Sequence, residues 1–302
     1  MDGDIGAGGA ASLTGPGQVV CCRGRQWRVL DHPLVRHALA EFVSGFEDPT
    51  LQFFDAALPA CRRLIDVGGY FGMLSLYAGD RVDEITLFEP SPSHQAVLRA
   101  HLALNPGVGA RTTVIQAAVG AAAGEHELFR KGFADSGASL FRVVERQGLL
   151  SGACEALVPV VAAATALAQA GLDADTLLKI DIEGAEYEVI PAIAGLLRQS
   201  RPFLQLSFHP FNLVAAGDAV ATNLLRLRRM IDLVEALRGY DYWYLPMRDG
   251  WREVTPEQMP GFLEAYLLQP KAVARIATRQ YGFVESMGFA RQRLDLPGCR
   301  AW

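Results

Sequence analysis

Short apolar runs alternate with helix-like segments through the middle of the chain. The runs are almost continuously apolar, which is typical of strands buried on both faces of a parallel sheet. The stretches 91–104 and 184–199 between them are expected to be helices, and Asn105-Pro106-Gly107 is a strong helix stop. This alternation predicts a doubly wound α/β domain with a mostly parallel sheet. The expected strands occupy residues 64–67, 85–89, 114–119, 177–182 and 203–208.

The pattern changes after residue 209. Residues 219–238 form an amphipathic helix, and 240–254 read as a hairpin that turns at 248–250. An antiparallel hairpin at the edge of the parallel strands predicts a seven-stranded sheet. The helix carries an apolar stripe that packs either on the sheet or on a second copy of the chain, which makes a homodimer one option. The stripe consists of Leu224, Leu227, Ile231, Val234 and Leu237.

At 302 residues the chain exceeds one ordinary domain. We expect a tail and helical lead-in at 1–44, the α/β domain at 45–256 and a helical extension at 257–302.

Charge and composition exclude several classes of protein. The net charge of −5 argues against a nucleic-acid partner. The longest weakly polar stretch, 157–172, is too short to cross a bilayer, and the N-terminus lacks the apolar core of a secretory signal. The five cysteines show no metal-binding spacing, so we expect free thiols and a cytoplasmic location.

A glycine-containing loop, DVGGYFG at 66–72, follows the first expected strand. Tyr70 and Met73 stand where the dinucleotide pattern G-x-G-x-x-G needs glycine, so the loop does not match that pattern. Glu89 ends the second strand, where a carboxylate can accept hydrogen bonds from a ribose diol. Together the loop and Glu89 indicate a nucleoside-type cofactor. The alternative is that the glycines serve only a tight turn.

The segment LLKIDIEGAE at 177–186 places charges in a strand that should be buried. Read as a strand, it projects Lys179, Asp181 and Glu183 to one face. Because unpaired buried charges are costly, a ligand, a metal or a proton-transfer role is the better explanation. The alternative is an internal Lys–Asp pair, with Glu183 or Glu186 neutralising the next helix N-terminus.

Taken in order, these motifs resemble the FkbM-type S-adenosylmethionine-dependent methyltransferases over about residues 45–215. The resemblance implies a class I methyltransferase fold, with the cofactor domain at 45–256. It also implies S-adenosylmethionine as methyl donor and a small-molecule hydroxyl acceptor, often a sugar or a secondary metabolite. One departure is Ser207, because the family's fifth strand commonly carries a glutamate there. The motifs are DVGGYFG (66–72), ITLFEPSPSHQAVLRAHLALN (85–105), AAVG (117–120), GASL (137–140), KIDIEGAE (179–186) and FHP (208–210).

The expected site residues lie at strand ends, where ligands bind in open α/β sheets. Methylation of an alcohol requires a general base. His209 is the first candidate and Asp181 the second, with Lys179 as a further catalytic residue. The plain alternative for His209 is a structural histidine before Pro210. The cofactor-binding candidates are Asp66, Gly68, Gly69, Gly72, Glu89, Pro90, Ala118 and Asp181.

A divalent metal is considered but not favoured. Asp181 suits Mg²⁺, yet the fifth strand offers Ser207, His209 and Asn212 rather than carboxylates.

The other five histidines, at 32, 37, 94, 101 and 126, are assigned no role in the chemistry, and His94 and His101 are expected on a helix surface. Ser139 either touches a ligand or makes a loop hydrogen bond. The aromatic residues at 240–244 either pack the hairpin or wall an acceptor pocket. The rival functions are a catalytically inactive, methyltransferase-like binding or regulatory protein and a nicotinamide-dependent oxidoreductase.

Overall fold

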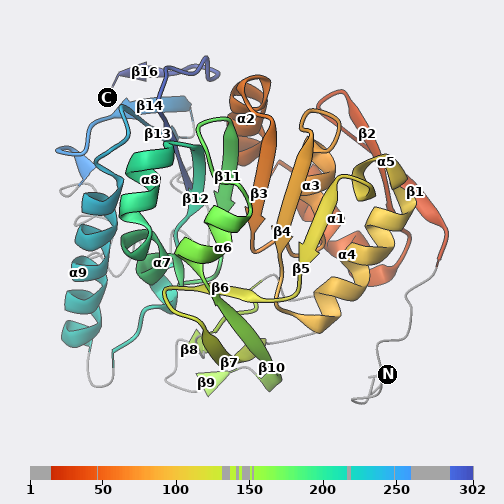
Figure 1. Cartoon of the computed structure of the whole chain (residues 1–302), viewed down its shortest axis with the longest axis horizontal. Helices are drawn as coiled ribbons and strands as arrows, with labels where there is room; N and C mark the ends of the chain where they lie inside the picture. The colour runs from red at the N-terminus through yellow and green to blue at the C-terminus, as the bar shows by residue number, and fades with distance from the viewer. Residues whose placement is uncertain are drawn as a thin grey trace.

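The structure of the protein, a computed structural model, has a nine-stranded sheet with helices on both faces (Figure 1). It describes residues 15–45, 47–130, 137–140, 143–144, 150–151, 153–215, 219–247, 249–259 and 286–301.

The parallel part of the sheet forms where the apolar runs predict it. Its strands lie in the order β12-β11-β3-β4-β5, and each pairs with its neighbours in parallel. The chain crosses from one side of β3 to the other between β4 and β11, so the strand order reverses beside β3. A crevice is expected outside the carboxyl ends at such a switch point. The bounds are β3 (Arg63–Val67), β4 (Glu84–Phe88), β5 (Thr112–Ile115), β11 (Thr176–Ile180) and β12 (Phe203–Ser207).

The antiparallel edge differs from the predicted seven-stranded arrangement. The hairpin β13 (Tyr242–Met247) and β14 (Gly250–Val254) is confirmed. However, β15 (Ser286–Ala290) inserts between β12 and β13, antiparallel to both, and β16 (Arg300–Ala301) adds beside β14. The expectation of a helical extension is therefore wrong for residues 286–301, and residues 260–285 lie outside the described part.

Helices cover the sheet in two layers, each over its own hydrophobic core. One core joins the sheet to α6, α7, α8 and α9, and the other joins it to α1, α2, α3 and α4. The predicted helix at 184–199 is divided in two after Pro191. The bounds are α1 (Pro33–Val43), α2 (Asp48–Ala57), η1 (Leu58–Ala60), α3 (Met73–Ala78), α4 (Pro92–Leu104), α5 (Pro106–Gly109), α6 (Ala163–Gln169), α7 (Glu186–Ala192), α8 (Ala194–Ser200), η2 (Pro210–Asn212) and α9 (Ala219–Leu237).

A small sheet lies beyond the carboxyl ends of the central strands (Figure 1). In it β10 (Ala153–Ala162) pairs with β6 (Ala118–Gly120) and β7 (Gly124–Arg130). A two-stranded ribbon of β8 (Val143–Val144) and β9 (Leu150–Ser151) accompanies it. These additions border the carboxyl edge of the large sheet.

The N-terminal region is only partly the expected tail and helical lead-in. Helix α1 is present, but β1 (Gly17–Cys22) and β2 (Arg25–Leu30) form an antiparallel hairpin before it. Both residues of the tight turn, Arg23 and Gly24, have positive φ, as such turns require. The boundaries at 44 and 256 stay predictions.

The apolar stripe predicted for α9 is confirmed toward the end of the helix and wrong at two earlier positions. Val234 and Leu237 are buried in the core, together with Met230 and Leu233. Leu224 and Ile231, which were assigned to the same stripe, are 62% and 46% exposed.

Candidate active site

The glycine loop is held in a shape that needs glycine. Gly68 has φ +84°, and a Cβ there would lie 1.9 Å from the carbonyl oxygen of Asp181. A Cβ on Gly69 would lie 2.4 Å from the side chain of Leu87. The N–H groups of both glycines donate to the carbonyl of Phe88 at 3.0 Å. The loop therefore presses against the ends of β4 and β11, with no room for a side chain at either glycine.

Glu89, at the end of β4, is fixed by the same loop. Its Oε2 accepts the N–H of Tyr70 at 2.8 Å, and its Oε1 accepts the N–H of Ser91 at 2.9 Å. The Nδ1 atom of His94 lies 3.2 Å from Oε1. A carboxylate has about four acceptor positions, so capacity remains for a ribose hydroxyl.

His94 and His101 are not on a helix surface as expected. His94 is 2% exposed and faces Glu89, and His101 is fully buried with Nδ1 2.8 Å from the carbonyl oxygen of Phe71. Burial lowers the pKa of His101. Both rings therefore fasten α4 to the cofactor loop and its surroundings.

Lys179 locks the loop from the neighbouring strand. Its Nζ donates to the carbonyl of Gly68 at 2.5 Å and lies 3.2 Å from Asp66 Oδ1 and 3.7 Å from Asp181 Oδ2. Burial alone would lower the pKa of Lys179, but Asp66, Asp181 and Glu47 outweigh it and raise the pKa. Lys179 is thus a charged clamp, and it cannot accept a proton.

Asp66 serves this clamp as well. Its Oδ2 accepts the hydroxyl of Ser75 at 2.8 Å, and the residue is 1% exposed. Of the described residues, Asp66 and Gly72 do not line the cavity, whereas the six other predicted cofactor residues do. Asp66 contacts Lys179 rather than the cavity, so its place in cofactor binding stays a prediction.

His209, after β12, is surrounded by carboxylates. Its Nδ1 lies 3.1 Å from Glu186 Oε1, while its Nε2 lies 3.5 Å from Asp181 Oδ1 and 3.4 Å from Glu183 Oε1. Burial would lower the pKa of His209, yet these carboxylates raise it well above the ordinary value. Carboxylates therefore lie against both ring nitrogens and favour the protonated ring. This environment weakens the case for His209 as general base, and its role stays a prediction.

Glu183 reaches the cluster through a turn. Strand β11 ends at Ile180, and Glu183 has φ +53°, so the predicted alternation of side chains along one strand is wrong at this position. Asn212 donates to the Glu183 carbonyl at 3.0 Å and to Oε2 at 3.1 Å. Burial raises the pKa of Glu183 to about 7. Asp181 and Glu186 act in the same direction, and His209 acts against them.

Ser139 makes the loop hydrogen bond that was one of its two expected roles. Its Oγ donates to the carbonyl of Glu183 at 2.7 Å.

Asp181, Glu183 and His209 could hold a divalent ion. Each offers one ligand atom, and these atoms lie within 4.8 Å of one another. Glu186, which is fully buried, contacts the other ring nitrogen of His209, as outer carboxylates do in metal sites. The donors fit an oxygen-rich site with one imidazole.

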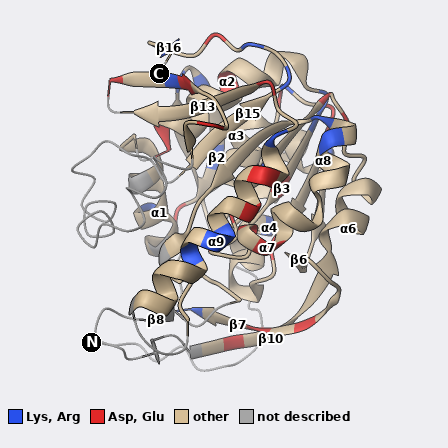
Figure 2. Ribbon diagram, turned by 90° about the vertical axis from the view of Figure 1, so that its left-hand side faces the viewer, with Lys and Arg blue, Asp and Glu red and all other residues tan. Residues whose placement is uncertain are grey.

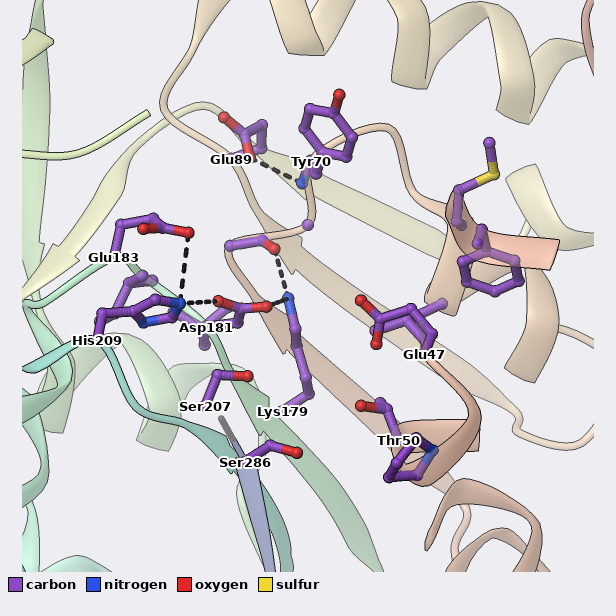
Figure 3. Close-up of a pocket in the computed structure, with 18 of the residues that line it drawn as sticks. Glu47, Thr50, Tyr70, Glu89, Lys179, Asp181, Glu183, Ser207, His209 and Ser286 are labelled. Carbon is purple, nitrogen blue, oxygen red and sulfur yellow. Dashed lines mark hydrogen bonds and ion pairs between the residues drawn. The ribbon is translucent and has the colours of Figure 1, made fainter. Parts of the chain in front are cut away.

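A cavity of about 750 Å³ lies at the carboxyl ends of the strands. Gly68, Glu89 and Ala118 line one end, which we call the cofactor end. The other, the acid end, is lined by Glu47, Thr50, Lys179, Asp181, Ser207, His209 and Ser286 (Figure 3).

Several residues of the acid end were not anticipated. Glu47 and Thr50 come from the start of α2, Met247 and Trp251 from the hairpin, and Ser286 from β15. For the aromatic residues at 240–244, the two expected roles were to wall a pocket or to pack the hairpin. Tyr240, Trp243 and Tyr244 are buried, so they pack the hairpin. In the sequence, Glu47-Asp48-Pro49 indicates the start of a helix. It does not indicate where the Glu47 side chain points.

Acidic and basic residues both occur on many helices, strands and loops of the ribbon (Figure 2). In the described part of the chain, no helix is both long enough and apolar enough to cross a membrane.

Comparisons with known proteins agree with the sequence motifs. A family model described as "Methyltransferase FkbM domain" matches residues 66–242, more than half of the chain. A search of curated proteins finds no significant match.

Three solved structures are similar to the chain at low identity. The methyltransferase FkbM from Methylobacillus flagellatus KT is 17% identical, with a TM-score of 0.39, 76% of this chain and 44% of that chain covered. A precorrin-6y C5,15-methyltransferase from Geobacter metallireducens GS-15 is 15% identical, with a TM-score of 0.35. The match covers 67% of this chain and 73% of that chain. A SAM-dependent methyltransferase from Agrobacterium tumefaciens is 11% identical, with a TM-score of 0.33. The match covers 72% of this chain and 59% of that chain. The chain spans less than half the length of the first of these proteins.

Proposed function

Because the chain belongs to the FkbM methyltransferase family, we propose that it transfers a methyl group from S-adenosylmethionine to a hydroxyl oxygen of a small molecule. The observation that carries the proposal is the single cavity that joins a nucleoside-like cofactor end to an acid end. Its volume of about 750 Å³ lies in the range typical of small-molecule sites.

The cofactor end fits S-adenosylmethionine. Gly68 and Gly69 line the cavity on a loop held tightly against Asp181 and Leu87, and Glu89 retains acceptor capacity for a ribose. When bound, S-adenosylmethionine supplies a methyl group on a positively charged sulfur. Asp181 and the other carboxylates of the acid end favour that positive charge.

The protein's own contribution is mainly alignment. Holding a hydroxyl oxygen in line with the methyl group can supply about 7–11 kcal/mol of the barrier. Asp181 lies between two cations, Lys179 and His209, and its side chain is 31% exposed to the cavity. We propose that Asp181 lies beside the cationic sulfur and helps to place the acceptor next to it, with Lys179 and His209 holding the carboxylate in place.

The acceptor we propose is a neutral hydroxylated metabolite or sugar with an apolar face. Phe42, Met247 and Trp251 supply apolar wall, while Thr50 and Ser286 supply hydroxyl groups. All five cysteines are free thiols, which supports a cytoplasmic location.

A methyl-transfer assay tests this function. Purified protein is incubated with methyl-labelled S-adenosylmethionine and a panel of glycosides, catechols and hydroxylated macrolactones, with amine and thiol analogues as matched controls. Each reaction is run with Mg²⁺ and with EDTA. We expect label on a hydroxyl oxygen.

Label on amines or thiols alone would overturn the O-methyl assignment. A folded protein that binds S-adenosylhomocysteine without transferring label would instead support a methyltransferase-like binding protein. Transfer that EDTA abolishes and Mg²⁺ restores would place an ion at Asp181, Glu183 and His209.

A further inference from the structure

Glu47 stands directly before helix α2, at the N-cap position. Its side chain makes no capping hydrogen bond to the α2 backbone. The carboxylate instead lines the cavity, on the opposite side from the strand ends that carry Lys179 and Asp181. In Figure 3 its oxygens point toward Lys179.

The core beneath α2 fixes this position. Leu51, Phe53 and Phe54 of the helix are fully buried against the sheet. Gly288 of β15 has no side chain where Phe53 packs, since a Cβ there would lie 2.2 Å from that ring. Glu47 is thus carried by a rigid element, as precise placement of a reacting group requires.

The other charged groups of the acid end are poorly suited to accept a proton. Lys179 is an ammonium group that already donates to Gly68, His209 has carboxylates against both ring nitrogens, and Asp181 lies between these two residues. Glu183 is tied to Asn212 and lies against His209. Glu47, in contrast, lies across the cavity from His209 (Figure 3), and its hydrogen-bond partner Thr50 is a neutral hydroxyl.

We infer that Glu47 takes the proton of the acceptor hydroxyl during methyl transfer, an inference that rests on the proposed function. The O–H proton passes to a Glu47 oxygen while an oxygen lone pair forms the new C–O bond. The S–CH₃ bond breaks, and its electron pair stays on sulfur, which becomes a neutral thioether. The protonated Glu47 then releases its proton to solvent through the cavity.

The surroundings of Glu47 suit this role. Burial and the nearby Asp181, with Asp66 adding, raise the pKa of Glu47 to about 7, against the opposing effects of Thr50 and Lys179. A general base works best when its pKa lies near the operating pH.

The test compares Glu47→Gln with Glu235→Gln, the same substitution on the exposed face of α9. Both variants are assayed with labelled S-adenosylmethionine and the hydroxyl panel, and their affinity for S-adenosylhomocysteine is measured by calorimetry. We expect Glu47→Gln to lower kcat by about 100–1000-fold with unchanged cofactor affinity, and Glu235→Gln to behave as wild type. For wild type, kcat/KM should rise with pH through an apparent pKa near 7, and Glu47→Gln should lose that rise. Glu47→Asp should restore part of the rate.

A rate for Glu47→Gln within about threefold of wild type, with the same pH profile, would overturn the inference. If wild type methylates no hydroxyl in the panel, the proposed function has failed, and Glu47 is then judged by its own titration. Carbon-13 NMR of glutamate-labelled protein bound to S-adenosylhomocysteine, with the Glu47 signal identified by its loss in Glu47→Gln, gives that midpoint. A midpoint near 7 supports the inference, and one below 5 overturns it.

Discussion

The two ends of the cavity are built on opposite principles. At the cofactor end, Gly68, Gly69 and Glu89 are fixed by hydrogen bonds and close contacts to neighbouring strands. At the acid end, carboxyl groups crowd around two cations, and the pKa values of Glu47 and Glu183 are raised to about 7. The first end is a tightly held loop, and the second holds carboxyl groups whose pKa values lie near neutral pH.

This contrast separates binding from chemistry. Substitutions at the cofactor end should remove affinity, because they change a shape that cannot relax. Substitutions at the acid end should lower turnover and leave affinity, because they change charge in a cavity that stays open. Lys179 joins the two ends, since it contacts both Gly68 and Asp181.

The largest effect is expected for Gly68→Ala. The new Cβ would lie 1.9 Å from the Asp181 carbonyl, at a φ of +84° that alanine tolerates poorly. We expect affinity for S-adenosylhomocysteine to fall by more than about 100-fold in calorimetry. Gly107→Ala is the control, because a Cβ there meets nothing within 4 Å. Equal binding by both variants would contradict the rigid-loop description.

A smaller effect, confined to turnover, is expected for Asp181→Asn. The substitution removes the anion between Lys179 and His209 but keeps its size. Turnover in the labelled methyl-transfer assay should fall by at least about 100-fold, while S-adenosylhomocysteine affinity stays within a few-fold. Loss of affinity instead would place Asp181 in the cofactor end and erase the division between the two ends.

The smallest effect is on stability as a function of pH. Glu183 keeps its proton in the folded protein up to about pH 7, whereas an unfolded glutamate loses it near 4.5. His209 similarly keeps its proton above the unfolded value of 6.5. Folding therefore binds protons, and these two groups make the free energy of unfolding decrease as pH rises from about 4.5 through 7 and beyond.

Thermal unfolding between pH 5 and 8.5 measures this trend. We expect Tm to fall with rising pH, by about 2–4 °C for each kcal/mol lost, and Glu183→Gln to flatten the slope below pH 7. Glu235→Gln should keep the wild-type slope. A wild-type slope unchanged in Glu183→Gln would show that Glu183 ionises normally at the acid end.

Much of the parallel sheet could be predicted from the sequence. Runs such as LIDV and FLQLSF must be buried on both faces, and their lengths admit strands rather than helices. The motif KIDIEGAE indicated the cluster at the carboxyl end of β11, and Asp181 and Lys179 do lie there. Local pattern is sufficient for these features because the strand itself sets where its residues go.

Other features depend on packing between distant segments. Ser286–Ala290 is a five-residue strand with a central glycine, and its place in the sheet follows from its neighbours β12 and β13. His94 is buried in contact with Glu89, although the helix pattern alone suggests a surface position. Glu47 reaches the cavity because the phenylalanines of α2 seat that helix on the sheet. The pKa of His209 is raised by Glu183, Glu186 and Asp181 together, and the sequence does not show that these three carboxylates meet at its ring.

Calorimetric titration with S-adenosylhomocysteine, with NAD⁺ as the control, tests the central claim most directly. The account predicts micromolar binding of S-adenosylhomocysteine and no heat from NAD⁺, because Tyr70 and Met73 replace the glycines that a pyrophosphate loop uses. Binding of NAD⁺, or of neither nucleotide by a demonstrably folded protein, would contradict the assignment of the cofactor end.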